Sequence, residues 1–122
     1  MKFKFDELVK QKIIYLREGL SDDDLDILYK VVEQSIFLER LYLSDNNKLT
    51  LADGKLANAI AKNTTIKVLH LSNIKISDEG IKHLTDALEE NYTLTHLSLG
   101  NNNIGDEGAK YIAEMLSVNN TL

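Results

Sequence analysis

The chain of 122 residues contains no cysteine, no proline and no tryptophan. The absence of cysteine excludes a disulfide framework, a thiolate metal site and catalysis by a thiol. No apolar run reaches the length of a membrane-spanning helix, and the lysines near the N-terminus precede no apolar stretch typical of a secretory signal. The sequence therefore predicts a cytoplasmic protein that does not contact membranes.

Positive charge is also scarce, because 14 basic residues stand against 19 acidic residues and the net charge is −5. This sign disfavours a general nucleic-acid-binding protein. The composition of 43% hydrophobic and 27% charged residues is typical of a globular chain. At this length we expect one domain, spanning residues 1–122.

Leucine, in contrast, is abundant at 20 residues, and many of the leucines recur with a period of 28 residues. Three units cover residues 38–65, 66–93 and 94–121. Each unit opens with the pattern L-x-x-L-x-L, with Ile66 in place of the first leucine of the second unit. The alternation predicts a short strand, and the later apolar spacing of three and four residues predicts a helix.

Polar residues mark the ends of the predicted helices. Either Ser77 or Asp78, and likewise Asp106, suits the N-cap or first turn of a helix, where free N–H groups need acceptors. Asn63, Asn91 and Asn119 recur where each helix is expected to stop.

The N-terminal third follows the repeat less closely. We interpret residues 12–37 as a degenerate repeat and residues 1–11 as a cap. The first strand can direct either Ile13 and Tyr15 or Ile14 and Leu16 into the core, and we favour the second register.

Units of the form L-x-x-L-x-L-x-x-N, 28 residues long, resemble leucine-rich repeat proteins of the ribonuclease-inhibitor-like subtype. The resemblance implies an α/β fold: a short solenoid with a parallel sheet on the concave face and helices on the convex face. Ile74 departs from the pattern, because it replaces the asparagine found at Asn46 and Asn102. We expect a local rearrangement there that involves Asn73.

Variable residues between the fixed leucines are predicted to point out of the concave face in rows across the strands. The first row is Tyr15, Tyr42, His70 and Ser98; the second is Ile13, Arg40, Val68 and His96; and the strand ends carry Arg17, Asp45, Asn73 and Asn101. Tyrosine and arginine are enriched at interface hot spots, so we predict a partner-binding surface centred on Arg40, Tyr42 and His70. The alternative is that these are ordinary solvated strand positions. The candidate partner-binding residues are Tyr15, Arg40, Tyr42, Asp45, Val68, His70, Asn73, His96, Ser98 and Asn101.

Catalytic patterns are weak. His70 and His96 share one face of adjacent predicted strands, with Asp45 nearby. These residues could bind a metal ion, but the pattern places no further residue to hydrogen-bond and orient them. The acidic clusters recur at one repeat offset and are explained as helix starts, and no phosphate-binding loop occurs. We predict no enzyme activity, no cofactor, no metal and no catalytic residues.

The resemblance implies a protein–protein interaction module that binds and inhibits or regulates a partner, by covering an enzyme active site with its concave face. It also allows a regulator of a small GTPase, a scaffold or receptor fragment with no inhibitory role, or a small effector that bacteria deliver into host cells. We expect a monomer, or a heterodimer with the target. Truncation of a longer array, natural termination and coverage by a partner or second copy remain three alternatives for the C-terminal end.

Overall fold

The computed structural model describes residues 3–17, 19–46 and 49–122, in which helices and strands alternate. The elements in chain order are α1 (Phe5–Leu8), β1 (Ile13–Tyr15), α2 (Asp22–Gln34), β2 (Arg40–Tyr42), α3 (Lys55–Lys62), β3 (Val68–His70), α4 (Asp78–Glu90), β4 (His96–Ser98) and α5 (Asp106–Val118).

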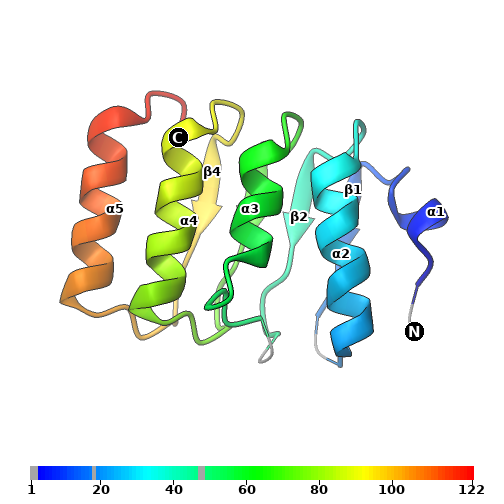
Figure 1. Ribbon diagram of the computed structural model, residues 1–122, viewed down its shortest axis with the longest axis horizontal. Coiled ribbons are helices and arrows are strands. Elements are labelled where there is room, and N and C mark those ends of the chain that lie inside the picture. The colour runs from blue at the N-terminus through cyan, green and yellow to red at the C-terminus, as the bar shows by residue number, and fades with distance from the viewer. Residues whose placement is uncertain (1–2, 18, 47–48) are drawn as a thin grey trace.

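The strands form one parallel sheet in the order β1-β2-β3-β4, and helices α2 to α5 lie side by side in a second layer. Figure 1 views the helix layer with the strands behind it, α1 at one end and α5 at the other. Each strand–helix unit buries its apolar side only by stacking on its neighbours. The predicted α/β solenoid is thus confirmed.

The register of the sheet follows the 28-residue period. Leu41 aligns with Leu69, and Ile14 aligns with Leu41 on the other side. Ile14 is 2% exposed, whereas the adjacent Tyr15 is 62% exposed. The favoured register of the first strand is therefore confirmed, and the repeated leucines are the buried core between the layers.

Serine hydroxyls start two of the helices as N-caps. Of the two predicted positions, Ser77 is the N-cap and accepts a hydrogen bond from the Gly80 N–H, while Asp78 begins α4. Ser21 accepts from the Asp24 N–H, and the Asp24 carboxylate accepts from the Ser21 N–H, which forms a capping box. Asp106 lies in the first turn of α5, after Gly105 at the N-cap.

Three asparagines end the helices and also join neighbouring repeats; with Ser35 they form what we term the helix-end ladder (Ser35, Asn63, Asn91 and Asn119). Asn91 shows the pattern: its Nδ2 donates to the Ile60 carbonyl one repeat earlier (3.1 Å), and its Oδ1 accepts from the N–H groups of Thr93 and Leu94 (3.0 and 2.9 Å). Asn63 and Asn119 make the equivalent bonds. These side chains are buried and supply partners for backbone groups that secondary structure leaves unpaired.

In the degenerate first repeat, Ser35 takes the ladder position. Its hydroxyl accepts from the Phe37 and Leu38 N–H groups and donates to the Val9 carbonyl in the N-terminal segment. Phe3, Phe5 and Leu8 pack partly buried against the core at this end. The N-terminal end of the solenoid is therefore covered.

The expected rearrangement around Asn73 is wrong. Ile74 is fully buried, and its N–H donates to the Asn102 side-chain oxygen of the next repeat (2.8 Å). The Asn73 side chain instead donates to Asp45 at the surface. Asn102 also donates to the Leu71 and Leu99 carbonyls, as Asn46 donates to the Leu16 and Leu43 carbonyls, so the asparagines on both sides of Ile74 join adjacent turns.

The repeat of residues 38–65 differs from the others. Its helix α3 has 8 residues, against 13 in α4, because the chain turns at Leu51 (φ 64°) and Gly54 (φ 73°) before α3 begins. Leu49 and Leu51 are buried beneath this turn. None of the helices in the described part of the chain has the length and apolar character needed to cross a membrane.

We expect Asn91→Ala to lower the free energy of unfolding by about 2–4 kcal/mol, because it leaves buried backbone groups without partners at roughly 1–3 kcal/mol each. Urea denaturation followed by circular dichroism measures the change. Asn58→Ala, at an exposed position of α3, is the matched control and should change stability by less than about 0.5 kcal/mol. Equal effects of the two substitutions would contradict the role of the ladder.

Candidate functional site

The candidate residues on the strands lie in two rows across the concave face. Tyr15, Tyr42, His70 and Ser98 align in one row. Ile13, Arg40, Val68 and His96 align in the other. Parallel pairing in register places residues separated by one repeat beside each other, so the structure brings the strand candidates together on one surface.

Three rings form a continuous stack, which we term the concave aromatic row (Tyr15, Tyr42 and His70). The ring centroids of Tyr15 and Tyr42 are 5.4 Å apart, and those of Tyr42 and His70 are 4.7 Å apart. Tilted rings at these distances attract one another. Together the three rings form a continuous aromatic strip across β1, β2 and β3.

A polar group lies at the ends of the same strands. The Asp45 carboxylate accepts hydrogen bonds from the Asn73 amide (2.9 Å) and from the Arg17 guanidinium (3.0 Å). These bonds, that of Asn73 first, hold the pKa of Asp45 below its ordinary value. Asp45 thus stays ionised to lower pH than a free aspartate.

Backbone conformation by itself explains why aspartate and asparagine occur at some positions of this polar group, with no functional role required. Asp45, Asn73 and Asn101 have φ values of 67°, 55° and 56°, in the left-handed region that aspartate and asparagine enter more readily than other non-glycine residues. The strand-end positions therefore select these residue types for the turn. The concave aromatic row and Arg40 have no such backbone reason.

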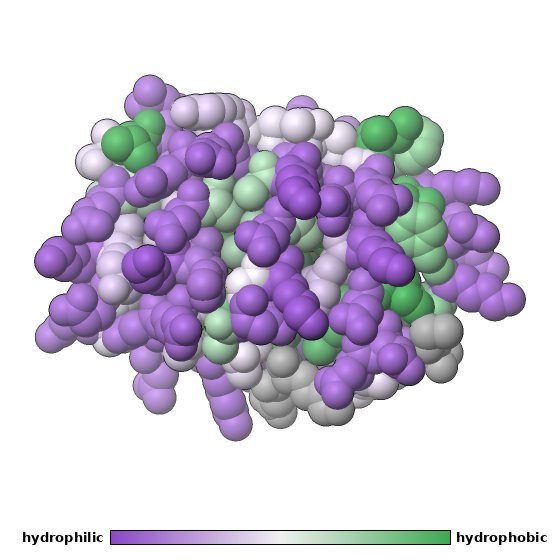
Figure 2. All heavy atoms as spheres, viewed as in Figure 1, coloured by the Kyte–Doolittle hydropathy of each residue, from purple (hydrophilic) through white to green (hydrophobic). Residues whose placement is uncertain are grey.

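The charge of the concave side differs from that of the whole chain. The strand segments 12–17, 39–45, 67–73 and 95–101 carry four basic and two acidic residues. They are Lys12, Arg17, Arg40 and Lys67, against Glu39 and Asp45. The acidic excess therefore lies outside these segments, and Figure 2 shows the opposite, helix-side face as largely hydrophilic.

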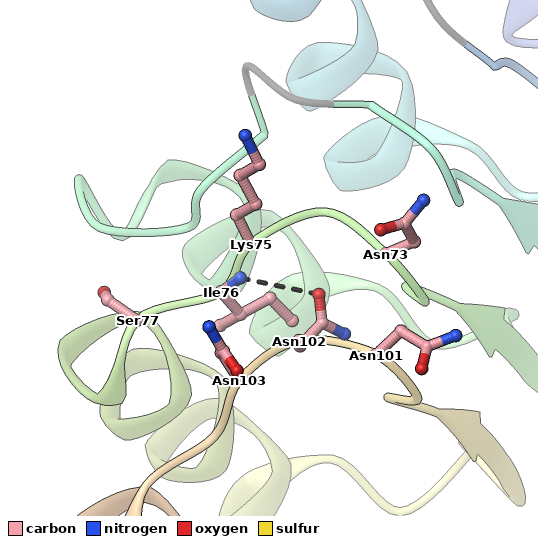
Figure 3. A pocket seen from close by; sticks show the side chains of 7 residues that line it. All are labelled: Asn73, Lys75, Ile76, Ser77, Asn101, Asn102 and Asn103. Carbon is pink, nitrogen blue, oxygen red and sulfur yellow. Dashed lines mark hydrogen bonds between the residues drawn. The ribbon is translucent and has the colours of Figure 1, made fainter.

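A hollow opens beside the strand ends, between the turns that follow β3 and β4. It has a volume of about 620 Å³, and Asn73, Lys75, Ser77, Asn101 and Asn103 are among its lining residues (Figure 3). Figure 3 also shows the hydrogen bond between Ile76 and Asn102 that ties the two turns. Amides dominate the lining, so the hollow extends the polar edge of the concave face.

Within the described residues, no group of three or more histidine, aspartate or glutamate side chains is placed to hold a metal ion. His70 packs on Tyr42, while the His96 ring nitrogen Nδ1 lies 2.9 Å from the Thr95 hydroxyl. The arrangement offers stacking and hydrogen-bonding surfaces for another molecule.

The sequence-based candidate set omitted two residues of this surface. Arg17 pairs with Asp45, and Ile13 is 54% exposed beside Arg40. The repeat spacing placed both beside candidate residues, since Arg17 stands one repeat of 28 residues before Asp45 and Ile13 begins the row that contains Arg40.

Known proteins are similar to this chain in two ways. Residues 62–84 and 90–113 match the family model described as Leucine Rich repeat. Among solved structures, one described as "Leiomodin-1 Actin-Binding Site 2 (ABS2)" aligns with a TM-score of 0.83 and 22% sequence identity, over 100% of this chain and 78% of that one. Among curated proteins, none matches. Both similarities indicate a leucine-rich repeat fold, and the ribonuclease-inhibitor-like subtype stays a prediction.

We expect Asn73→Gly to raise the pKa of Asp45 toward its ordinary value, because the amide donor is lost while glycine tolerates the positive φ. An NMR titration of the Asp45 carboxyl carbon measures the shift. Asn101→Gly, in the same backbone conformation one repeat further on, is the control. A shift of equal size in both variants would contradict the assignment.

The depressed pKa also sets the direction of the stability change with pH. The bonds to Asp45 contribute stability above the pKa of the unfolded aspartate and lose it as pH falls through the lower folded pKa. The stability gap between wild type and Asn73→Gly should therefore narrow in acid, as urea titrations at several pH values would show. A gap that widens in acid would contradict this reading.

Proposed function

We propose that this chain is a protein-binding module that binds its partner with the concave face. The concave aromatic row and Arg40 carry this proposal, because they are surface residues of hot-spot type that no requirement of the fold explains. The leucine-rich repeat match and the likeness to a structure described as an actin-binding site support a role in protein interaction. Catalysis, cofactors and metal ions have no part in the proposal.

In its more specific form, the proposal is that binding inhibits or regulates the partner by covering an enzyme active site. The concave side carries exposed rings, a basic excess and amide groups within a narrow four-stranded arc. Such a surface fits the rim of a polar cleft with acidic side chains, for which Arg40 is a direct partner. A cytoplasmic partner, including a host protein met by a delivered effector, is consistent with this form.

Two substitutions on the concave aromatic row test the binding surface. Tyr42→Ala combined with His70→Ala should weaken binding of a partner recovered with the wild-type chain by about 2–4 kcal/mol. Calorimetric titration measures the affinity, and urea denaturation checks that the variant stays folded. The control replaces Glu89 and Glu114, exposed on α4 and α5, with alanine. An affinity within threefold of the wild type for the aromatic variant would contradict the proposed surface.

Actin is a second candidate partner, because the aligned structure is described as an actin-binding site and its alignment spans all of this chain. Co-sedimentation with filaments and a fluorescence titration with monomeric actin test this directly. If actin is the partner, binding should fall with the double substitution on the aromatic row and persist in the convex-side control. If the wild-type chain binds neither form, actin is excluded as the partner and the general proposal of a protein-binding module still stands.

A further inference from the structure

The concave aromatic row has a spacing that can be compared with the regular elements a partner could present. Its rings come from β1, β2 and β3, which are neighbours in the sheet. The row therefore runs across the strands, with ring centroids 5.4 Å apart between Tyr15 and Tyr42 and 4.7 Å apart between Tyr42 and His70. A partner segment that contacts each ring in turn presents its side chains at nearly the same steps.

An α-helix matches these steps, and an extended strand does not. Helix residues at i, i+4 and i+7 lie on one stripe, with steps of about 6.0 and 4.5 Å along the axis. Side chains on one face of a strand are about 6.6–6.8 Å apart. Over the two ring intervals, the helix stays within about 1 Å of the rings, whereas the strand moves about 3 Å out of step. The row therefore favours a helix, with one turn on each ring.

The side of the row at which the strands begin is basic. Lys12, Arg40 and Lys67 are exposed there, and no ion pair in the described part of the chain includes any of them. The Lys12 carbonyl accepts from the Glu39 and Arg40 N–H groups. The Glu39 carbonyl accepts from the Lys67 N–H, so the four residues lie side by side. Their three positive charges and one negative charge attract carboxylates.

The other side of the row, where the strands end, has no such excess of charge. The Asp45 carboxylate is already bonded to the Arg17 guanidinium and to the Asn73 amide. The strand-end position of the next repeat is Asn101. The concave face is thus polarised, with a basic side, an aromatic centre and an amide side.

Arg40 gives the basic side its specificity. In the sheet register it lies between Ile13 and Val68, so apolar side chains flank it on both sides. Ile13 is 54% exposed, which leaves this part of the surface open to a partner. A carboxylate can form two parallel hydrogen bonds with a guanidinium. A partner without a carboxylate at this point would bury Arg40 unpaired, which is costly.

From the spacing and the charge together, we infer that the partner segment is an acidic amphipathic helix of about three turns that lies across β1, β2 and β3. Its apolar stripe contacts the concave aromatic row, and carboxylates on one flank pair with Arg40, Lys12 and Lys67. Uncharged polar residues on the other flank face the amide side. The face spans at most about 20 Å from Glu39 to Asp45, which holds a helix about 10–12 Å wide. The inference rests on the proposed concave-face function and specifies the chemistry of the partner.

Synthetic peptides of about 14 residues test the inference directly. The probe peptide has leucines at i, i+4, i+7 and i+11 and glutamates along one flank, with alanine and glutamine elsewhere. One control replaces a central glutamine with proline, which breaks the helix and keeps the charge. A second control replaces every glutamate with lysine. NMR spectra of the isotope-labelled chain give the affinity and the residues contacted.

The probe peptide should shift the amide signals of the strand segments and bind with a dissociation constant below about 1 mM. Each control peptide should bind at least about tenfold more weakly. No binding of the probe peptide at that concentration, equal affinity for the proline peptide, or equal affinity for the lysine peptide would each overturn the inference. The second outcome would favour an extended partner segment, and the third a partner recognised without charge.

A reversal of charge at Arg40 tests the basic side. Arg40→Glu should weaken binding of the probe peptide at least about tenfold and strengthen binding of the lysine peptide. Lys110→Glu makes the same change of charge at an exposed position of α5 and should leave both affinities unchanged. Circular dichroism verifies the fold of each variant. Equal effects of the two substitutions would contradict the assignment of the basic side.

A partner recovered with the wild-type chain separates this inference from the proposed function. If Tyr42→Ala with His70→Ala weakens the complex and Arg40→Glu does not, the concave face binds the partner and the acidic helix is wrong. If neither variant weakens the complex, both proposals are wrong. If both variants weaken it, peptides that cover the partner's sequence should place the contact in an acidic helical segment. A contact in any other kind of segment would overturn the inference and leave the proposed function standing.

Discussion

The rest of this solenoid depends on one constraint: the backbone N–H and carbonyl groups need hydrogen-bond partners where the chain turns back from helix to strand. Stacking of the 28-residue repeats buries these turns between neighbouring repeats, where water cannot form hydrogen bonds with the N–H and carbonyl groups. The side chains of Asn63, Asn91 and Asn119 each donate to the repeat before and accept from the N–H groups two and three residues further along the chain. Because each bond set spans two repeats, the same atoms hold the stack together and fix the sheet register.

The ladder also explains why variation is tolerated at some sites. Ser35 replaces asparagine in the first repeat because the N-terminal segment brings the Val9 carbonyl within reach of a short hydroxyl. At the other bend, Ile74 takes the position of an asparagine, its side chain is buried in the core, and its N–H donates to the Asn102 side chain.

Fold and candidate function use different residues of the same strands. Ile14, Leu41 and Leu69 face the helices and are buried, while the adjacent Tyr15, Tyr42 and His70 face out and stack. The period of two along a strand separates the two sets. Changes in the outward set therefore alter the surface without removing core volume, which is how a repeat scaffold acquires a partner.

The period of 28 was enough to predict most of the fold. Leucine spacing predicted the strands, recurring polar residues predicted the helix ends, and the favoured register of the first strand directed Ile14 and Leu16 inward. The rearrangement at Asn73 was predicted wrongly, because the Asn73 side chain bonds to Asp45 at the surface. The spacing placed Arg17, Asp45 and Asn73 together at the strand ends, but it did not predict the hydrogen bonds between them.

By itself, the sequence determined the architecture, because a repeated pattern of apolar residues has one efficient way to be buried, by stacking. It also determined which residue types face outward. Only the tertiary structure decided which of these meet: the stacked rings and the Arg17–Asp45–Asn73 group. Such contacts depend on rotamers and on what covers each face, and a linear pattern contains neither.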